Sequence, residues 1–176
     1  MQVADHYAKG AEVFNNYTPR SNCDLLRLYG FVLESNTLPI HIPIEIKLQD
    51  VPHSNIKSDI LRKYDLEPLP YPYMDQSHYI TATEISPKLL QMLVVKYYGL
   101  SEEEINEPSL IPAPESMKAD KQQIKQELTK IVKSKIKAMP ELVQAKTMRN
   151  NAALLVRNEE MKALLDFLKL IPKLKL

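Results

Sequence analysis

Three aromatic side chains and one arginine near the start of the chain have the types and spacing to form a small reactive pocket. Tyr17 carries a phenol that donates or accepts a hydrogen bond and stays neutral at pH 7, because its pKa is near ~10. Tyr29 and Phe31 flank Gly30, which lets another group approach the backbone closely. Together these rings suit a pocket for a flat cofactor and a cationic side chain, and Arg20 is placed to contact a partner.

Ordinary packing explains the same four residues, and the pattern alone favours it. Aromatic residues are common at strand ends, where a residue such as Tyr17 packs on the core. Tyr29 and Phe31 then form part of the core as well, and Arg20 is simply solvated. These residues taken alone leave both interpretations open.

Short elements must position the aromatic side chains. We expect strands over residues 2–8 and 12–17, joined by a turn at Lys9-Gly10, because the second run is rich in Val, Phe and Tyr. A Thr-Pro pair ends that run. Ser21 or Asn22 then caps a short helix over residues 23–28, which a left-handed glycine ends.

The remainder of the chain predicts mostly helix. Isoleucines alternate with polar residues from 40 to 48, which indicates a half-buried strand that Pro43 confines to an edge. A second short strand is expected at 78–82. Four further helices are predicted. Three begin at local signals, namely Ser54 as a cap, Ser86 as a cap with Pro87 as the first helical residue, and Ser101 with Glu104 as a capping box. The fourth is an amphipathic run from 124 to 136, which Met139-Pro140 ends.

A long helical region carries the leucines from 154 to 168, and we expect the basic tail over residues 169–176 to fray. A boundary near residues 36–40 separates a β-type N-terminal piece from the mostly helical remainder. The predicted fold class is therefore mainly α, with a helical domain over 37–176 that follows a short β-rich piece over 1–36.

Composition excludes several function classes. The chain has 176 residues, 44% of them apolar, and a net charge of +1. This net charge gives no reason to expect electrostatic binding to nucleic acid or to a membrane. Glycine occurs only 3 times, and no phosphate-binding loop motif is present. Cys23 is the only cysteine, so an internal disulfide or a thiolate zinc cluster cannot form. The 4 histidines share no metal-ligand spacing, and we predict no metal site.

Targeting signals are not evident in the sequence. The N-terminus has no long apolar run typical of a signal peptide, and the apolar stretches fall short of the ~20 residues that span a membrane. We therefore expect a cytoplasmic or nuclear protein with no membrane partner and no direct nucleic acid partner.

A family resemblance rests on residues 9–31. The run Lys-Gly-Ala-Glu-Val-Phe-Asn-Asn-Tyr-Thr-Pro-Arg-Ser-Asn over residues 9–22, followed by a leucine pair and Tyr-Gly-Phe, resembles the C-terminal motif of SET-domain methyltransferases. It is most similar to the class that resembles the Rubisco large-subunit lysine methyltransferase. The stretch from Ile85 to Ile105 is loosely similar to part of the helical substrate-binding domain that follows the SET domain in this class.

The resemblance implies a function and roles for the aromatic residues. It implies transfer of a methyl group from S-adenosylmethionine to a lysine of a protein substrate, with catalysis by positioning and polar stabilisation and no metal. Tyr17 becomes the catalytic tyrosine that orients the target amine. Tyr29 and Phe31 become cofactor-binding residues, Phe31 near the adenine and Tyr29 lining the pocket or the target channel. Arg20 is similar to a position near the substrate backbone. Residues 1–36 become the C-terminal portion of the SET domain.

Two substitutions depart from the family pattern. Thr18 replaces the usual glycine after the tyrosine, and a β-branched residue avoids positive φ, so the local turn is expected to differ. Ala11 replaces a common glutamate, which is a mild surface change.

A larger departure is the upstream family segment Arg-Phe-x-Asn-His-x-Cys, which nothing in this sequence matches. We therefore expect the chain to be the C-terminal portion of a longer methyltransferase and to have little or no activity in isolation. Its N-terminal strands would lack partners, so strand exchange between chains is a hazard.

Two other functions remain open from the sequence. In one, the helical domain is a non-catalytic module that binds a protein and the SET segment is vestigial. In the other, the chain is a plain helical scaffold with accidental aromatics. The substrate protein is not identified, since family members act mostly on lysine and one branch modifies histidine.

Overall fold

A computed structural model describes residues 9–10, 19–68, 77–140 and 147–175. Within these ranges the chain forms six α-helices and one small two-stranded antiparallel sheet, which confirms the mainly helical fold class. The β-type runs predicted over 2–8 and 12–17 lie outside the described residues. The helices are α1 Asn22–Tyr29, α2 Ser54–Lys63, α3 Pro87–Tyr97, α4 Glu102–Asn106, α5 Lys121–Ala138 and α6 Met148–Leu170.

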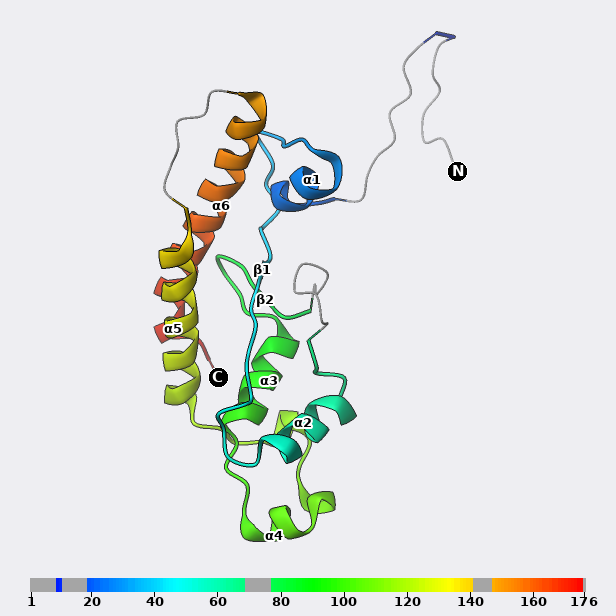
Figure 1. The fold of residues 1–176 in the computed structure, drawn as a ribbon, viewed down its shortest axis with the longest axis vertical. Coiled ribbons are helices and arrows are strands. Elements are labelled where there is room, and N and C mark those ends of the chain that lie inside the picture. Colours follow the sequence, from blue (N-terminus) through cyan, green and yellow to red (C-terminus); the bar gives the residue numbers. More distant parts are fainter. Residues whose placement is uncertain (1–8, 11–18, 69–76, 141–146, 176) are drawn as a thin grey trace.

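The two longest helices, α5 and α6, lie side by side along one flank of the molecule (Figure 1). The α1 helix packs against α6 near one end of this pair, while α2, α3 and α4 lie toward the other end. No described helix has the length and apolar character needed to cross a membrane.

The sheet in the described residues is short. Strand β1 Ile42–Pro43 pairs antiparallel with β2 Tyr79–Ile80. The predicted alternation is confirmed, since Ile40, Ile42, Ile44 and Ile46 are all buried and the residues between them are more exposed. The pairing covers two residues on each strand, with one further bond from the Ile44 amide to the His78 carbonyl at 2.9 Å. The Pro43 nitrogen points away from β2, because only alternate residues of an antiparallel pair bond to the partner strand. Pro43 therefore leaves this pairing intact and removes a donor from the outer edge of the sheet.

Capping side chains begin the helices largely where the sequence predicts. The Ser86 hydroxyl accepts from the Leu89 amide with proline as the first residue of α3, and the Ser101–Glu104 capping box of α4 is complete. The prediction for α2 is wrong by one position. His53, in the left-handed region at φ 56°, precedes the helix without a side-chain cap, and Ser54 is the first helical residue.

The core lies between α3, α5 and α6. Leu93 of α3, Leu128 of α5 and Phe167 of α6 have no exposed surface. Complete burial of such side chains is worth roughly 1.5–3 kcal/mol each. The expectation of a fraying tail is wrong for residues 171–173, which form a short 3₁₀ turn. Ile171 in that turn is buried, and Lys125 Nζ donates to the Pro172 carbonyl at 2.8 Å.

Candidate functional site

Helix α1 and the loop after it hold the described part of the candidate site. Ser21 caps the helix, because its hydroxyl accepts from the Asp24 amide at 3.3 Å and donates to the Asp24 carboxylate at 3.0 Å. Gly30 ends it in the left-handed conformation at φ 79°, and its amide donates to the carbonyls of Leu25 and Leu26. The predicted helix and its glycine end are both confirmed.

Asn22 fixes the loop that follows α1, a role that sequence reasoning missed. Its side-chain amide donates to the Leu33 carbonyl and to Glu159 Oε1, each at 2.9 Å. Its side-chain oxygen accepts from the Leu33 amide at 2.9 Å and from Asn36 Nδ2 at 3.2 Å. All four hydrogen-bonding positions of this buried side chain are therefore satisfied. Sequence reasoning considered Asn22 only as a helix cap.

Tyr29 and Phe31 come together at the end of α1. Their ring centroids are 6.2 Å apart with an interplanar angle of 31°, and each side chain is 40% exposed. Leu28 and Leu33 beside them are also exposed. The core-packing interpretation of the two rings therefore does not hold, because large apolar side chains that pack in a core are not exposed to this degree.

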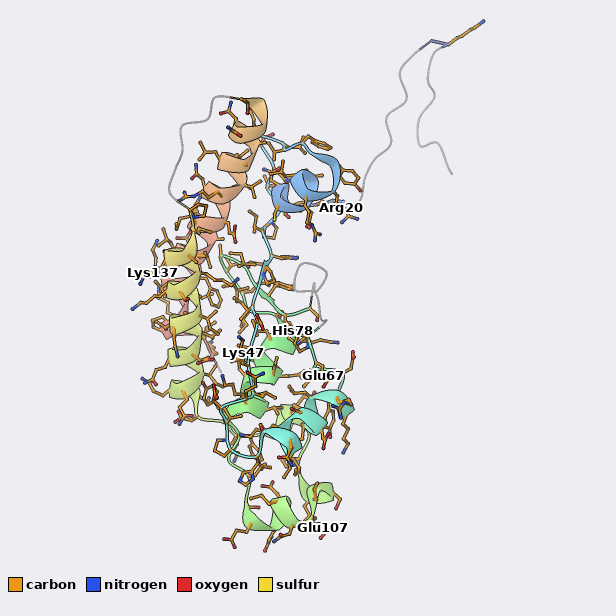
Figure 2. The ribbon with its side chains drawn as sticks, viewed as in Figure 1. Arg20, Lys47, Glu67, His78, Glu107 and Lys137 are labelled. Atoms are coloured by element: carbon orange, nitrogen blue, oxygen red, sulfur yellow. The ribbon has the colours of Figure 1, made fainter. Side chains whose placement is uncertain are left out.

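Arg20 is joined to the same loop through its backbone. Its carbonyl accepts from Asn36 Nδ2 at 2.8 Å, the amide that also contacts Asn22. The Nε atom of Arg20 is buried and has no hydrogen-bond partner among the described residues. The labelled side chain lies next to α1 in Figure 2. Tyr17, the predicted catalytic residue, lies outside the described residues.

The thiol of Cys23 in α1 is not set up as a nucleophile. Burial, followed by the charges of Asp24 and Glu160, raises the pKa of this thiol above its usual range. A thiol with a raised pKa is protonated and weakly reactive at neutral pH. In the part of the chain that the structure describes, no group of three or more His, Cys, Asp or Glu side chains is placed to hold a metal ion.

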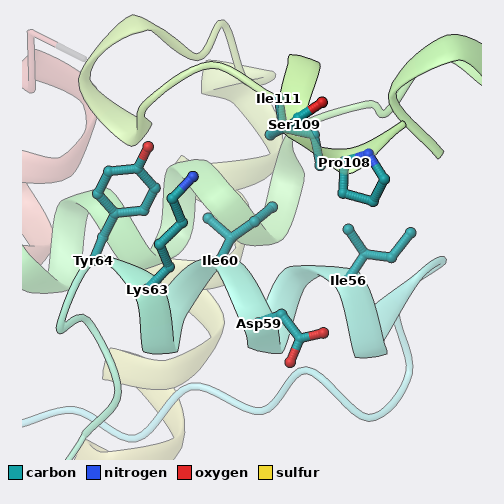
Figure 3. A pocket seen from close by; sticks show the side chains of 8 residues that line it. All are labelled: Ile56, Asp59, Ile60, Lys63, Tyr64, Pro108, Ser109 and Ile111. Carbon is teal, nitrogen blue, oxygen red and sulfur yellow. The ribbon is translucent and has the colours of Figure 1, made fainter. Parts of the chain in front are cut away.

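Two hollows open elsewhere on the helical part, and neither is lined by α1. One, of about 290 Å³, lies between α2 and the turn Pro108–Leu110 (Figure 3). The other, of about 560 Å³, lies beside the segment 45–49. The side chains around the first are Ile56, Asp59, Ile60, Lys63, Tyr64, Pro108, Ser109 and Ile111. Its surface combines the apolar residues Ile56, Ile60, Pro108 and Ile111 with four polar side chains. The sequence predicted neither hollow, because residues far apart in the chain form them.

A buried polar network joins α2, α3 and α5. Lys57 Nζ donates to the Lys96 carbonyl at 2.7 Å, and Lys96 Nζ contacts Glu127 Oε1 at 2.8 Å. Burial lowers the pKa of Lys57. Burial and the Glu127 carboxylate raise the pKa of Tyr97 to about 12. Because these groups satisfy one another between helices, we interpret the network as structural.

Comparison with known proteins gives one partial similarity. The chain is 36% identical over 94 residues to the ribosomal lysine N-methyltransferase set10 of Schizosaccharomyces pombe. That stretch is 50% of this chain and only 16% of the yeast protein, so the chain spans a small part of the relative. No protein-family model matches the chain.

Proposed function

We propose that this chain is the C-terminal part of an S-adenosylmethionine-dependent protein-lysine N-methyltransferase of the SET class, acting on a ribosomal lysine. The motif over residues 9–31 and the similarity to a ribosomal lysine N-methyltransferase support this proposal. Residues 1–36 would belong to the SET domain and residues 37–176 to the substrate-binding domain. The contact of α1 with α6 supports a fixed junction between these two parts.

The exposed pair Tyr29 and Phe31 carries the proposal. Two flat rings at the solvent surface, beside a loop that the Asn22 side chain anchors, fit a purine, because aromatic faces stack on such rings. Exposed apolar groups of this size commonly mark a binding surface. When bound, S-adenosylmethionine would supply an electrophilic methyl group for direct transfer to a neutral amine.

The remaining roles follow from the chemistry of each side chain. The neutral phenol of Tyr17 would hold the target amine in line by a hydrogen bond. Phe31 would pack on the adenine, and Tyr29 would line the pocket. Arg20 would contact the backbone of the substrate through its guanidinium, which carries donors in a fixed planar arrangement.

The test uses the whole protein encoded by the gene that contains this chain. Purified ribosomes are incubated with it and with tritiated S-adenosylmethionine, and the hydrolysed protein is analysed for labelled methyl-lysine. We expect label with the native protein and a loss of at least 100-fold with Tyr17→Phe, because general acid–base and positioning groups typically contribute 10²–10⁴-fold. Tyr79→Phe is the matched control, because Tyr79 lies in β2 and stacks on His41 away from α1.

The same assay separates the rival functions. The 176-residue chain alone should transfer little or no label, and substantial transfer would contradict the proposed division of the pocket. A whole protein that transfers no label to ribosomes or to a cell extract would favour the non-catalytic binding module. Unchanged labelling with Tyr17→Phe would favour the plain scaffold.

A further inference from the structure

Charge is strongly segregated in this chain, although its net charge is only +1. Helix α5 carries six lysines and one glutamate, which gives a net charge of +5 over residues 121–138. Residues 101–116, which include α4, carry five glutamates and no basic residue, which gives −5. Such segregation creates local potentials that a near-zero net charge conceals.

The solvent face of α5 is a continuous polar stripe. Positions three and four residues apart share a helix face, and six exposed polar residues of α5 with this spacing are Gln123, Gln126, Lys130, Lys133, Ser134 and Lys137. We call this set the α5 stripe. At a rise of about 1.5 Å per residue it extends for about 21 Å along the helix. Figure 2 shows Lys137 on the outer side of α5.

The lysines of the α5 stripe form no close ion pair in the described part of the chain, although the charge of Lys130 is near enough to help lower the pKa of Glu127. The ion pairs of that part include none with Lys130, Lys133 or Lys137. The one glutamate of α5, Glu127, is turned toward Lys96 at 2.8 Å, so its charge is used inside the molecule. The positive charge of the stripe is therefore available to a partner.

We propose that the α5 stripe binds the phosphate backbone of RNA. Protein–protein interfaces have an apolar, desolvated centre and are depleted of lysine, whereas the only apolar side chain among the exposed residues of α5 is the small Ala138. Lysine, glutamine and serine side chains are common contacts to phosphate and sugar. The composition of the stripe therefore fits a nucleic acid better than an acidic protein.

Glutamine and serine favour RNA over DNA at this surface. Both side chains donate and accept hydrogen bonds, and the ribose 2′-hydroxyl that distinguishes RNA offers a donor and an acceptor. Gln123, Gln126 and Ser134 alternate with the lysines along the stripe. The inference goes beyond the proposed function, and its test involves no methyl transfer. It departs from the expectation of no direct nucleic acid partner, which came from the net charge.

The experiment measures fluorescence anisotropy of a labelled 20-nucleotide uridine RNA with the 176-residue chain at 50–200 mM salt. We expect a dissociation constant in the micromolar range at 50 mM salt, with log affinity falling by about 0.7 for each phosphate neutralised per unit of log salt. The variant Lys130→Gln/Lys133→Gln/Lys137→Gln should bind at least tenfold more weakly. Because three phosphate contacts are lost, the slope of log affinity against log salt should become shallower by about 2. Glutamine has nearly the helix propensity of lysine, so α5 should stay folded, which circular dichroism checks.

A matched variant removes the same charge elsewhere. Lys9→Gln/Lys47→Gln/Lys63→Gln replaces three exposed lysines outside α5 and α6 and should retain RNA binding within about twofold. Equal weakening in both triple variants would overturn the proposal, as would unchanged binding by the α5 variant. A thymidine DNA of the same length that binds as tightly would overturn the commitment to RNA. A 20-residue polyglutamate that binds as tightly would show that the surface recognises an acidic protein.

Discussion

The side-chain amide of Asn22 in α1 donates a hydrogen bond to the carboxylate of Glu159 in α6 at 2.9 Å, across 137 positions of the sequence. The same amide group holds the loop after α1 through Leu33. One buried side chain therefore sets both the shape of the loop that displays the aromatic pair and its attachment to the helical part. Loss of Asn22 should loosen the two together.

Asn22→Ala is expected to lower the free energy of unfolding by about 2–4 kcal/mol. The substitution removes two hydrogen bonds to the backbone of Leu33, worth about 0.5–1.5 kcal/mol each, and the bond to the charged Glu159, worth about 1.5–3 kcal/mol. Urea unfolding followed by circular dichroism measures the change. Asn55→Ala, at an exposed position of α2, is the matched control and should change stability by less than about 0.5 kcal/mol. A similar small change at Asn22 would contradict this role.

The Lys96–Glu127 pair should make stability depend on pH in the acid range. Burial alone would raise the pKa of Glu127, but hydrogen bonds from Lys96 and Tyr97 outweigh it and hold the pKa below its usual range. A carboxyl whose pKa is lower in the folded state stabilises the fold above its unfolded pKa, near ~4.3. That contribution is lost as the pH falls through the lower, folded value. Urea unfolding from pH 7 to pH 3 should show the fall.

Glu127→Gln tests the assignment of that pH dependence. At pH 7 the variant should be less stable by about 1.5–3 kcal/mol, the usual contribution of a hydrogen bond to a charged group. The difference from the native chain should shrink toward pH 3, where the native carboxyl is itself protonated. Asp166→Asn removes an exposed carboxylate paired with Lys169 and serves as the control. If Glu127→Gln keeps the full loss of stability between pH 7 and pH 3, other groups cause that loss.

Local sequence signals predicted most of the helices, because hydrogen bonds between residues within one turn determine where these helices begin and end. The Ser86-Pro87 start of α3, the Ser101–Glu104 capping box and the end of α5 before Met139-Pro140 each depend on residues within one turn. The tail was mispredicted for a different reason. Ile171 is buried by tertiary packing in the core, which no local pattern reveals.

The candidate site was only partly predictable from sequence. The pairing of Tyr29 with Phe31 follows from their spacing around a left-handed glycine, which is a local property. Their exposure and the role of Asn22 depend on contacts with α6 and the loop, far away in sequence. The α5 stripe is periodic and visible in the sequence, but the low net charge led to the expectation of no direct nucleic acid partner.

Tyr97 and Tyr98 should ionise later than ordinary tyrosines. Burial first, and then Glu127, raises the pKa of Tyr97 to about 12, and a hydrogen bond to Glu104 does the same for Tyr98. Absorbance near 295 nm should therefore continue to rise above pH 11. Glu104→Gln removes the charge beside Tyr98 and should move part of this rise to lower pH, while Tyr97→Phe/Tyr98→Phe should reduce it and leave the contribution of Tyr79, whose pKa burial and Glu84 also raise.

Stability at alkaline pH should depend on the ionisation of the same two phenols, those of Tyr97 and Tyr98. A pKa that is higher in the folded state adds stability below the unfolded value, near ~10, and that addition is lost as the pH rises toward 12. The native chain should therefore lose stability between about pH 10 and 12 in urea unfolding. The double phenylalanine variant should lose less over that interval, and an equal loss would show that other groups control alkaline unfolding.

Tyr29→Ala/Phe31→Ala separates binding from folding. Because each ring is 40% exposed, the variant of the 176-residue chain should unfold within about 1 kcal/mol of the native chain. In the whole protein the same change should weaken S-adenosylmethionine binding at least tenfold in calorimetric titration, since each aromatic contact is worth about 0.5–1.5 kcal/mol beyond its buried area. Leu110→Ala removes an exposed apolar side chain remote from α1 and should leave binding unchanged. Native affinity in the double variant would show that the rings serve another surface, whereas a large loss of stability would show that they support the fold.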